Sequence, residues 1–98
     1  YAGLQAYQGA AQHFRSVGER RTAIAAAVDA VKTTLALTAK AGLPRGKVTG
    51  AGTGTYLFEA ASEVYDELQV GSYIFMDADY AKNDWTESGI PRFEHSLF

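Results

Sequence analysis

Residues 47–76 read KVTGAGTGTYLFEAASEVYDELQVGSYIFM, and this stretch decides the fold. It begins with an extended run at 47–51, passes through alternating glycines, and continues into a short helix predicted over 58–65. The next run, 68–76, is rich in β-branched and aromatic residues, which favour strands. A strand, a helix and a second strand in this order predict parallel pairing and an α/β fold.

A longer helix precedes this stretch and is predicted over 17–41. The sequence SVGE fits a capping box, in which the Ser16 hydroxyl accepts from the N–H of Glu19 and the Glu19 carboxylate reaches back. Apolar residues then recur every three or four positions and predict one buried stripe, formed by Ile24, Val28, Val31 and Leu35. Gly42, with a proline two positions later, ends the helix.

The remaining segments predict further elements of a parallel sheet. Residues 1–9 predict a strand that places Gln5 and Tyr7 on one face, because strand side chains alternate. Residues 77–94 predict a polar, acidic loop, and 95–98 the start of another strand. About three parallel strands with one full helix would leave most of the sheet bare. The chain therefore reads as a part of a larger structure.

Composition narrows the class of protein. The 98 residues are 47% hydrophobic and 20% charged, which argues against intrinsic disorder. There is no cysteine, which excludes disulfides and cysteine-ligated zinc. No apolar run is recognised that approaches the roughly 18 to 20 residues of a membrane span, and no leader is visible. An isoelectric point of about 5.6 argues against nucleic-acid binding. We expect a cytoplasmic protein without membrane or nucleic-acid partners.

Charge is unevenly distributed along the chain. Residues 1–49 hold seven Lys or Arg against two Asp or Glu, a net charge of +5. Residues 50–98 hold two against nine, a net charge of −7. Opposite charges favour packing of the two halves together, or of each half against another part of a longer chain.

The glycine-rich run after the second strand is the main functional signal. Gly50, Gly52 and Gly54 alternate with small residues that include Thr53 and Thr55. Unblocked backbone N–H groups and hydroxyl donors in a small space suit a phosphate. The spacing fits neither the dinucleotide-binding pattern nor the P-loop pattern. A phosphate site and a flexible turn both remain open on these residues alone.

Other polar residues have two interpretations each. Gly71 and Ser72 could form a second pair of donors, or a bulge followed by a surface hydroxyl. Asp77 and Asp79 could face a cation, or belong to a solvated acidic loop. Surface or packing roles are predicted for the isolated histidines, His13 and His95. Four tyrosines could flank a planar ring or fill a core: Tyr7, Tyr56, Tyr73 and Tyr80.

Three segments carry a resemblance to a known family: GLQAYQG (3–9), VTGAGTGTYLFEAASEVYDELQVGSYIFMDADYAKN (48–83) and RFEHSLF (92–98). They resemble the D-threonine aldolase and 3-hydroxy-D-aspartate aldolase family. Members of this family are pyridoxal-phosphate enzymes of the alanine-racemase-like fold type III, and they are related to D-serine dehydratase. The resemblance implies the C-terminal part of a pyridoxal-phosphate-binding (β/α)₈ barrel. Residues 1–76 would form its last strands and helices, and 77–98 a linker and first strand toward a C-terminal β-domain.

The resemblance also implies a phosphate site. Thr53, between Gly52 and Gly54, matches the hydroxyl residue that binds the cofactor phosphate, and Gly71 and Ser72 match the pair that grips the same phosphate from the next strand. Barrels hold phosphates beyond the carboxyl ends of strands. Both groups can reach one phosphate only if the strand is 68–70, so we expect 73–76 to belong to a following segment.

Further residues are implied to face the cofactor ring. Gln5 and Tyr7 match the strand that lines it. Gln69 falls where alanine racemases place an arginine against the pyridine nitrogen. A neutral amide there would leave the nitrogen less protonated and the electron sink weaker, which favours retro-aldol cleavage over racemisation.

The implied function is that of a pyridoxal-phosphate- and divalent-metal-dependent aldolase, of which this chain is a segment. It would cleave a β-hydroxy-D-amino acid to glycine and an aldehyde, as a homodimer. The Schiff-base lysine is expected before Tyr1 and the metal ligands after Phe98, and none of the lysines here stands in the family's lysine context: Lys32, Lys40, Lys47 and Lys82. The alternatives are a D-serine dehydratase-type lyase and a non-catalytic pyridoxal-phosphate-binding protein.

Overall fold

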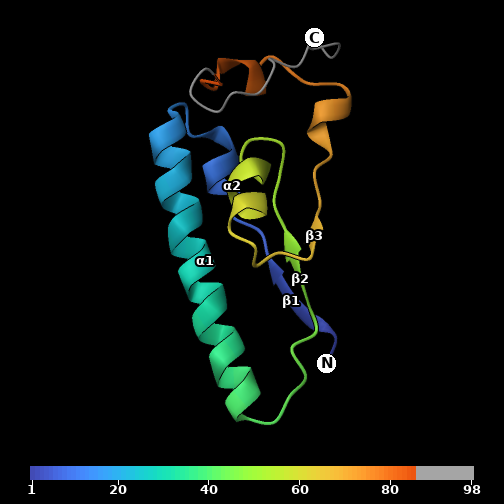
Figure 1. Ribbon diagram of the computed structural model, residues 1–98. Helices are drawn as coiled ribbons and strands as arrows, with labels where there is room; N and C mark the ends of the chain where they lie inside the picture. The colour runs from blue at the N-terminus through green and yellow to red at the C-terminus, as the bar shows by residue number, and fades with distance from the viewer. Residues whose placement is uncertain (86–98) are drawn as a thin grey trace.

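A three-stranded parallel sheet with helices packed on one face forms the structure, a computed structural model that describes residues 1–85 (Figure 1). The strands are β1 (Gly3–Ala6), β2 (Lys47–Gly50) and β3 (Glu67–Leu68), in the order β1-β2-β3. The α-helices are α1 (Val17–Lys40) and α2 (Tyr56–Ala61). Three 3₁₀ turns complete the fold: η1 (Ala10–His13), η2 (Ser72–Ile74) and η3 (Tyr80–Lys82).

Both ends of α1 carry a cap that the sequence predicts, although the reciprocal bond to the Glu19 carboxylate is not found within residues 1–85. The Ser16 hydroxyl accepts from the N–H of Glu19 at 3.1 Å. At the other end, the N–H of Leu43 donates to Thr38 O and that of Gly42 to Ala39 O, both at 3.0 Å, while Gly42 takes a φ of 81°. This pair of bonds is the Schellman motif, which needs a residue in the left-handed region.

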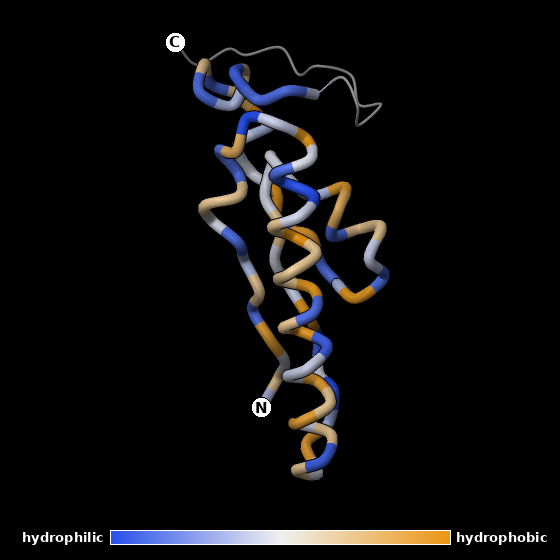
Figure 2. The backbone as a smooth tube through the Cα atoms, turned by 90° about the vertical axis from the view of Figure 1, so that its left-hand side faces the viewer, coloured by the Kyte–Doolittle hydropathy of each residue, from blue (hydrophilic) through white to orange (hydrophobic). Residues whose placement is uncertain are grey.

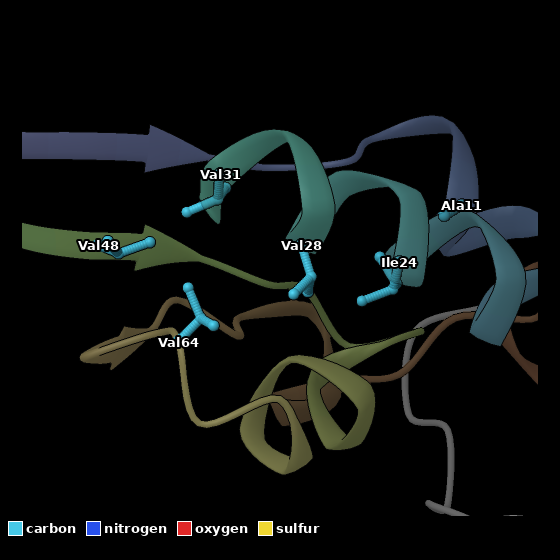
Figure 3. Packing of buried hydrophobic residues seen from close by; sticks show 6 residues of the cluster. All are labelled: Ala11, Ile24, Val28, Val31, Val48 and Val64. Carbon is cyan, nitrogen blue, oxygen red and sulfur yellow. The ribbon is translucent and has the colours of Figure 1, made fainter. Parts of the chain in front are cut away.

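The core lies between α1, α2 and the sheet. Figure 3 shows Ile24, Val28 and Val31 of α1 pointing toward Val48 of β2 and toward Val64, which follows α2. All five are buried, and the predicted stripe residue Leu35 packs against them partly exposed. The stripe prediction is therefore confirmed, and it fixes which face of the sheet α1 covers.

The parallel register determines which side chains share the face of the sheet that points away from the helices. Leu4 pairs with Val48, Gln5 with Thr49, and Thr49 with Glu67. Since side chains alternate along a strand, Leu4 and Val48 face the helices while the polar partners share the other face. Parallel pairing confirms the predicted α/β class; a complete barrel stays a prediction.

Helix α1 corrects one expectation about membranes. Among residues 1–85 it is the helix that is long and apolar enough, by length and composition alone, to cross a membrane. Many alanines stand between its aliphatic residues and raise its mean hydropathy, and Figure 2 shows hydrophobic and hydrophilic residues interleaved along the chain. Of the apolar window of α1, 17% is buried, and the buried stripe of Ile24, Val28 and Val31 lies against the sheet.

Some predicted boundaries are wrong. The first strand covers only Gly3–Ala6, and the short helix begins earlier and ends earlier than 58–65, at Tyr56–Ala61. It stops because Glu63 takes a φ of 58°, outside helical geometry. The β-favouring run 68–76 is a strand only at its start, and Ser72–Ile74 forms a 3₁₀ turn. The strand is thus Glu67–Leu68 instead of the predicted 68–70, and a separate segment after it is confirmed.

The segment 77–85 is not a solvated loop, contrary to the simplest interpretation of its acidic residues. It packs against the N-terminal end of α1 (Figure 1), where Trp85 is 6% exposed and the guanidinium of Arg20 lies 5.2 Å from its ring centroid. Arg20 itself is buried and donates to the carbonyl oxygens of Phe14, Arg15 and Asp84. The rest of the predicted loop, and the expected strand at 95–98 with His95, lie outside the described residues.

Ion pairs join the two oppositely charged halves. Arg15 Nη2 lies 2.7 Å from Asp79 Oδ1, and Arg45 Nη1 lies 2.6 Å from Asp66 Oδ2. Hydrogen bonding to Arg15 lowers the pKa of Asp79, and at Asp66 the main cause of the lowered pKa is the bond from the backbone N–H of Val48. The halves therefore pack together as their charges predict.

Candidate functional site

A cavity of about 320 Å³ lies beyond the carboxyl-terminal ends of all three strands. Its walls come from residues at or after the ends of β1, β2 and β3. They are Gln5, Tyr7, Ala51, Gly52, Thr53, Gln69, Gly71, Ser72 and Tyr80. In parallel α/β folds this edge of the sheet is where ligands bind.

Seven of the eight predicted site residues line this one cavity: Gln5, Tyr7, Gly52, Thr53, Gln69, Gly71 and Ser72. The eighth, Gly54, does not line it. Its N–H donates to Gln12 Oε1 at 2.8 Å, and a Cβ there would lie 2.4 Å from the backbone oxygen of Gln12. In the structure, Gly54 therefore allows close packing of two backbones behind the cavity.

The loop after β2 is buried over its full length, from 51 to 55. Ala51 takes a φ of 72°, a left-handed conformation that is uncommon for a residue with a Cβ. A Cβ at Gly52 would lie 2.5 Å from Gln12 Oε1 and 3.1 Å from Tyr7 Cε2. A side chain at Gly52 would thus push into the amide and the ring that flank the loop.

Backbone donors at the cavity are available for a ligand. Within residues 1–85, no hydrogen-bond partner is found for the N–H groups of Gly52, Thr53, Gly71 or Ser72. Gly52 and Thr53 are buried, and because buried N–H groups are almost always paired, these two are suited to an anion, while Gly71 and Ser72 are exposed. The hydroxyls of Thr53 and Ser72 add two further donors. This donor set fits the phosphate of pyridoxal phosphate.

A row of polar side chains crosses the open face of the sheet below the cavity. Gln5 Nε2 donates to Gln69 Oε1 at 2.7 Å, and Thr49 Oγ1 donates to Gln5 Oε1 at 3.0 Å. Gln69 Nε2 donates to Glu67 Oε1 at 3.0 Å. Both ends of the Gln69 amide therefore have partners in the row, which orients it beside Gln5.

Two tyrosines stand at the cavity wall with different exposure. Tyr7 is 54% exposed, whereas Tyr80 is 7% exposed. Burial raises the pKa of the Tyr80 phenol, and a hydrogen bond with the Ser72 side chain opposes this shift. At neutral pH the Tyr80 hydroxyl is therefore protonated. Of the other two tyrosines considered, Tyr56 is half-buried and the side chain of Tyr73 is exposed, and neither lines the cavity.

A fully buried polar chain lies behind the loop. Gln12 Nε2 donates to Thr55 Oγ1 at 2.8 Å, and Thr55 Oγ1 donates to Glu59 Oε1 at 2.7 Å. Within the described residues, Glu59 Oε2 has no hydrogen-bond partner. Desolvation raises the pKa of Glu59, although the bond from Thr55 opposes this.

The remaining candidates form a separate cluster at the surface. His13 Nδ1 lies 2.6 Å from Asp79 Oδ2, and the His13 ring lies 5.0 Å from that of Tyr80. Asp77 Oδ1 accepts from the N–H of Tyr80 at 2.9 Å, so this carboxylate caps a turn. Within residues 1–85 there is no group of three or more His, Cys, Asp or Glu side chains that could hold a metal ion.

Sequence reasoning missed the supporting residues of the site. Gln12 lies in a stretch predicted as a plain loop, and nothing in its local pattern distinguishes it from Gln8. Thr55 and Glu59 stand four residues apart, which on a helix places them on one face. That spacing is the signal that could have identified the pair, had the helix start been predicted correctly.

Comparisons with known proteins support the resemblance seen in the sequence. The chain is 46% identical over its full length to a D-threonine aldolase from an Arthrobacter species, of which it covers 25%. It is 48% identical over 82 residues, 84% of its length, to a 3-hydroxy-D-aspartate aldolase from Paracoccus denitrificans, of which it covers 21%. No protein-family model matches the chain.

A solved structure gives the same result. The crystal structure of D-threonine aldolase from Filomicrobium marinum aligns with 98% of this chain at a TM-score of 0.87 and 47% identity, and the alignment covers 25% of that protein. The chain thus spans about a quarter of the length of the relatives it matches. Sequence and structure together confirm that this chain resembles a segment of the D-threonine aldolase and 3-hydroxy-D-aspartate aldolase family.

Proposed function

We propose that this chain is the cofactor-phosphate-binding segment of a pyridoxal-phosphate- and divalent-metal-dependent aldolase that acts on β-hydroxy-D-amino acids. The observation that carries the proposal is the cavity beyond the strand ends, with four backbone N–H groups at its wall that have no hydrogen-bond partner within residues 1–85. The names of the relatives support the aldolase reaction. The reaction would break the Cα–Cβ bond and release glycine and an aldehyde.

The two loops at the cavity would hold the phosphate from two sides. Gly52 and Thr53 follow β2, and Gly71 and Ser72 follow β3, the neighbouring strand. Hydrogen bonds from N–H groups to a charged acceptor are about twice as strong as those between neutral groups. Several such bonds would anchor the cofactor without a lysine or arginine at the cavity wall.

The side chains of β1 and of the polar row would orient the cofactor ring. Tyr7 is half-exposed at the cavity and offers an aromatic face. Gln69 is a neutral amide and cannot hold a full positive charge on a ring nitrogen as an acid could. When bound, pyridoxal phosphate withdraws electrons from the substrate Cα, which makes the Cα–Cβ bond cleavable. The lysine that bears the cofactor and the ligands of the divalent metal would lie outside this 98-residue segment.

The test uses the full-length protein that carries this segment. After loading with pyridoxal phosphate and Mn²⁺ or Mg²⁺, we expect D-threonine to yield glycine and acetaldehyde, and 3-hydroxy-D-aspartate to yield glycine and glyoxylate. Ammonia and pyruvate from D-serine, without aldehyde from either substrate, would instead identify a dehydratase. Cofactor binding with no turnover of any of the three would identify a non-catalytic binding protein.

A further inference from the structure

We propose that Gln12 is a positioning residue for the phosphate loop: its buried amide holds residues 52–55 in the shape that leaves the N–H groups of Gly52 and Thr53 available to a phosphate. The inference depends on the proposed function, because the phosphate is that of pyridoxal phosphate. Gln12 does not line the cavity and would act through the loop alone.

The Gln12 side chain is 0% exposed, and both ends of its amide are used. Nε2 donates to Thr55 Oγ1 at 2.8 Å and to Gln8 O at 3.1 Å, while Oε1 accepts from the N–H of Gly54 at 2.8 Å. A backbone N–H can only donate, so the Gly54 contact fixes which end of the amide is oxygen. Thr55 must then accept from Nε2, and it gives its own proton to Glu59.

Hydrogen bonds within the loop and to Gln12 involve Gly54, Thr55 and Tyr56. Gln12 binds Gly54 and Thr55, and the N–H of Thr55 and of Tyr56 both donate to Gly52 O, at 3.1 and 3.0 Å. The inner side of the turn is therefore saturated. Of the N–H groups of residues 52–55, those of Gly52 and Thr53 have no partner among residues 1–85, and both residues line the cavity.

The fit between Gln12 and the loop is close. A Cβ on Gly52 would come within 2.5 Å of Gln12 Oε1, and one on Gly54 within 2.4 Å of Gln12 O. Gln12 is itself fixed from behind, because Asn83 Nδ2 donates to Gln12 O at 2.7 Å and Asn83 Oδ1 accepts from Arg15. Every N–H of the Gln12 amide and its oxygen are hydrogen-bonded, which specifies one arrangement of Gln12 and the loop groups it joins.

The test compares variants of the full-length protein by the dissociation constant for pyridoxal phosphate and, separately, by the melting temperature without cofactor. Gln12→Met keeps the side-chain volume but removes the donor and the acceptor. We expect it to raise the dissociation constant about tenfold or more. Gln8→Met is the matched control, because only the backbone oxygen of Gln8 takes part in the network, and it should stay within about twofold.

A second variant decides the matter if Gln12→Met does not fold. Gln12→Glu has the same shape, and only its protonated form can donate to Thr55. Ionisable groups around this site include Glu59, through Thr55, Tyr7, beside Gly52, and the buried Arg20, which lines a small cavity with Gly54 and Thr55. We expect the ratio of the variant's dissociation constant to that of the wild type to rise as pH increases from about 5.5 to 8.5, since the new carboxyl loses its proton. Taking the ratio at each pH cancels the titration of the cofactor phosphate itself.

The outcomes separate the inference from the proposed function. A ratio that stays flat with pH, or a Gln12→Met protein that binds the cofactor like the wild type, overturns the positioning role and leaves the function intact. A wild-type protein that does not bind pyridoxal phosphate overturns both. The role of Gln12 is supported if the ratio of dissociation constants for Gln12→Glu rises with pH and the Gln8→Met protein binds the cofactor like the wild type.

Discussion

The backbone N–H of Tyr73 donates to Thr53 Oγ1 over 3.0 Å, and this bond joins the loop after β2 to the turn after β3. Thr53 is 1% exposed, so its hydroxyl has little access to water. A hydroxyl has one proton to donate and can accept in addition. Thr53 can therefore accept from Tyr73 while its own proton remains available to an anion in the cavity.

Replacing Thr53 should weaken cofactor binding. Thr53→Val removes one charge-assisted hydrogen bond, which corresponds to roughly 1.5–3 kcal/mol, or about 10- to 150-fold in the dissociation constant for pyridoxal phosphate. Thr53→Ser keeps the hydroxyl and should stay close to the wild type. Dialysis of the full-length protein followed by absorbance titration with the cofactor measures both. An unchanged dissociation constant in Thr53→Val would make Thr53 a turn residue only.

Two glycine-to-alanine changes should have opposite effects on stability. Gly54→Ala would place a Cβ 2.4 Å from the backbone oxygen of Gln12, and backbone atoms cannot give way cheaply. We expect a lower melting temperature for the full-length protein. Gly18→Ala, in the first turn of α1, meets no atom within 4 Å and should stabilise by about 0.5–1 kcal/mol. Equal melting temperatures for the two variants would contradict the close packing at Gly54.

The sequence predicted those parts of the fold that depend on local patterns. Ser16, the stripe from Ile24 to Val31 and Gly42 each act within one helix, and each behaves as predicted. The run 68–76 is predicted as a strand because of its β-propensity, but this propensity reflects packing on a sheet, and within residues 1–85 Ile74 and Phe75 are 63% and 64% exposed. Only the requirement that two loops meet at one phosphate separated that segment from the strand.

The residues of the candidate site also divide into those that a local pattern predicts and those that it does not. Glycines and hydroxyls at strand ends are visible in a sequence, so the residues at the cavity wall could be named in advance. Gln12 and Arg20 are buried polar residues with partners far away in the chain, Thr55 for Gln12 and Asp84 for Arg20. These contacts arise from tertiary structure, and no local pattern predicts them. Glu59 differs, because its partner Thr55 stands four residues before it in the sequence.

The buried carboxyl of Glu59 should make stability depend on pH. Desolvation raises its pKa in the folded state, so the folded protein keeps this proton over a range in which the unfolded chain has lost it. Stability from this group is therefore fully present below the unfolded pKa and falls as pH rises toward the raised folded value. Glu59→Gln removes the ionisable group and keeps the shape.

We expect the melting temperature of Glu59→Gln to exceed that of the wild type increasingly as pH rises above about 5, toward a difference that reflects roughly 1–3 kcal/mol for a buried, unpartnered polar oxygen. Glu63→Gln is the control, because Glu63 is exposed two residues beyond α2. A difference between Glu59→Gln and the wild type that does not change with pH would mean that Glu59 stays ionised in the folded protein.

The 98-residue chain by itself should not fold as a stable, cooperative unit. In the part of the chain that the structure describes, β1 and β3 are edge strands, each paired with β2 alone, and β3 is only two residues long. The open face of the sheet carries the polar row instead of a core, and the aromatic and aliphatic side chains of 73–75 are exposed. The radius of gyration is 14.6 Å, against about 13 Å for a compact domain of 100 residues.

Urea titration should therefore show a broad, non-cooperative change in the fluorescence of Trp85, the chain's one tryptophan, and hydrogen exchange should show weak protection of β1–β3. The full-length protein is the control, in which the same strand amides should exchange slowly. A sharp transition and full amide protection in the monomeric 98-residue chain would show that these open edges and faces do not limit its stability.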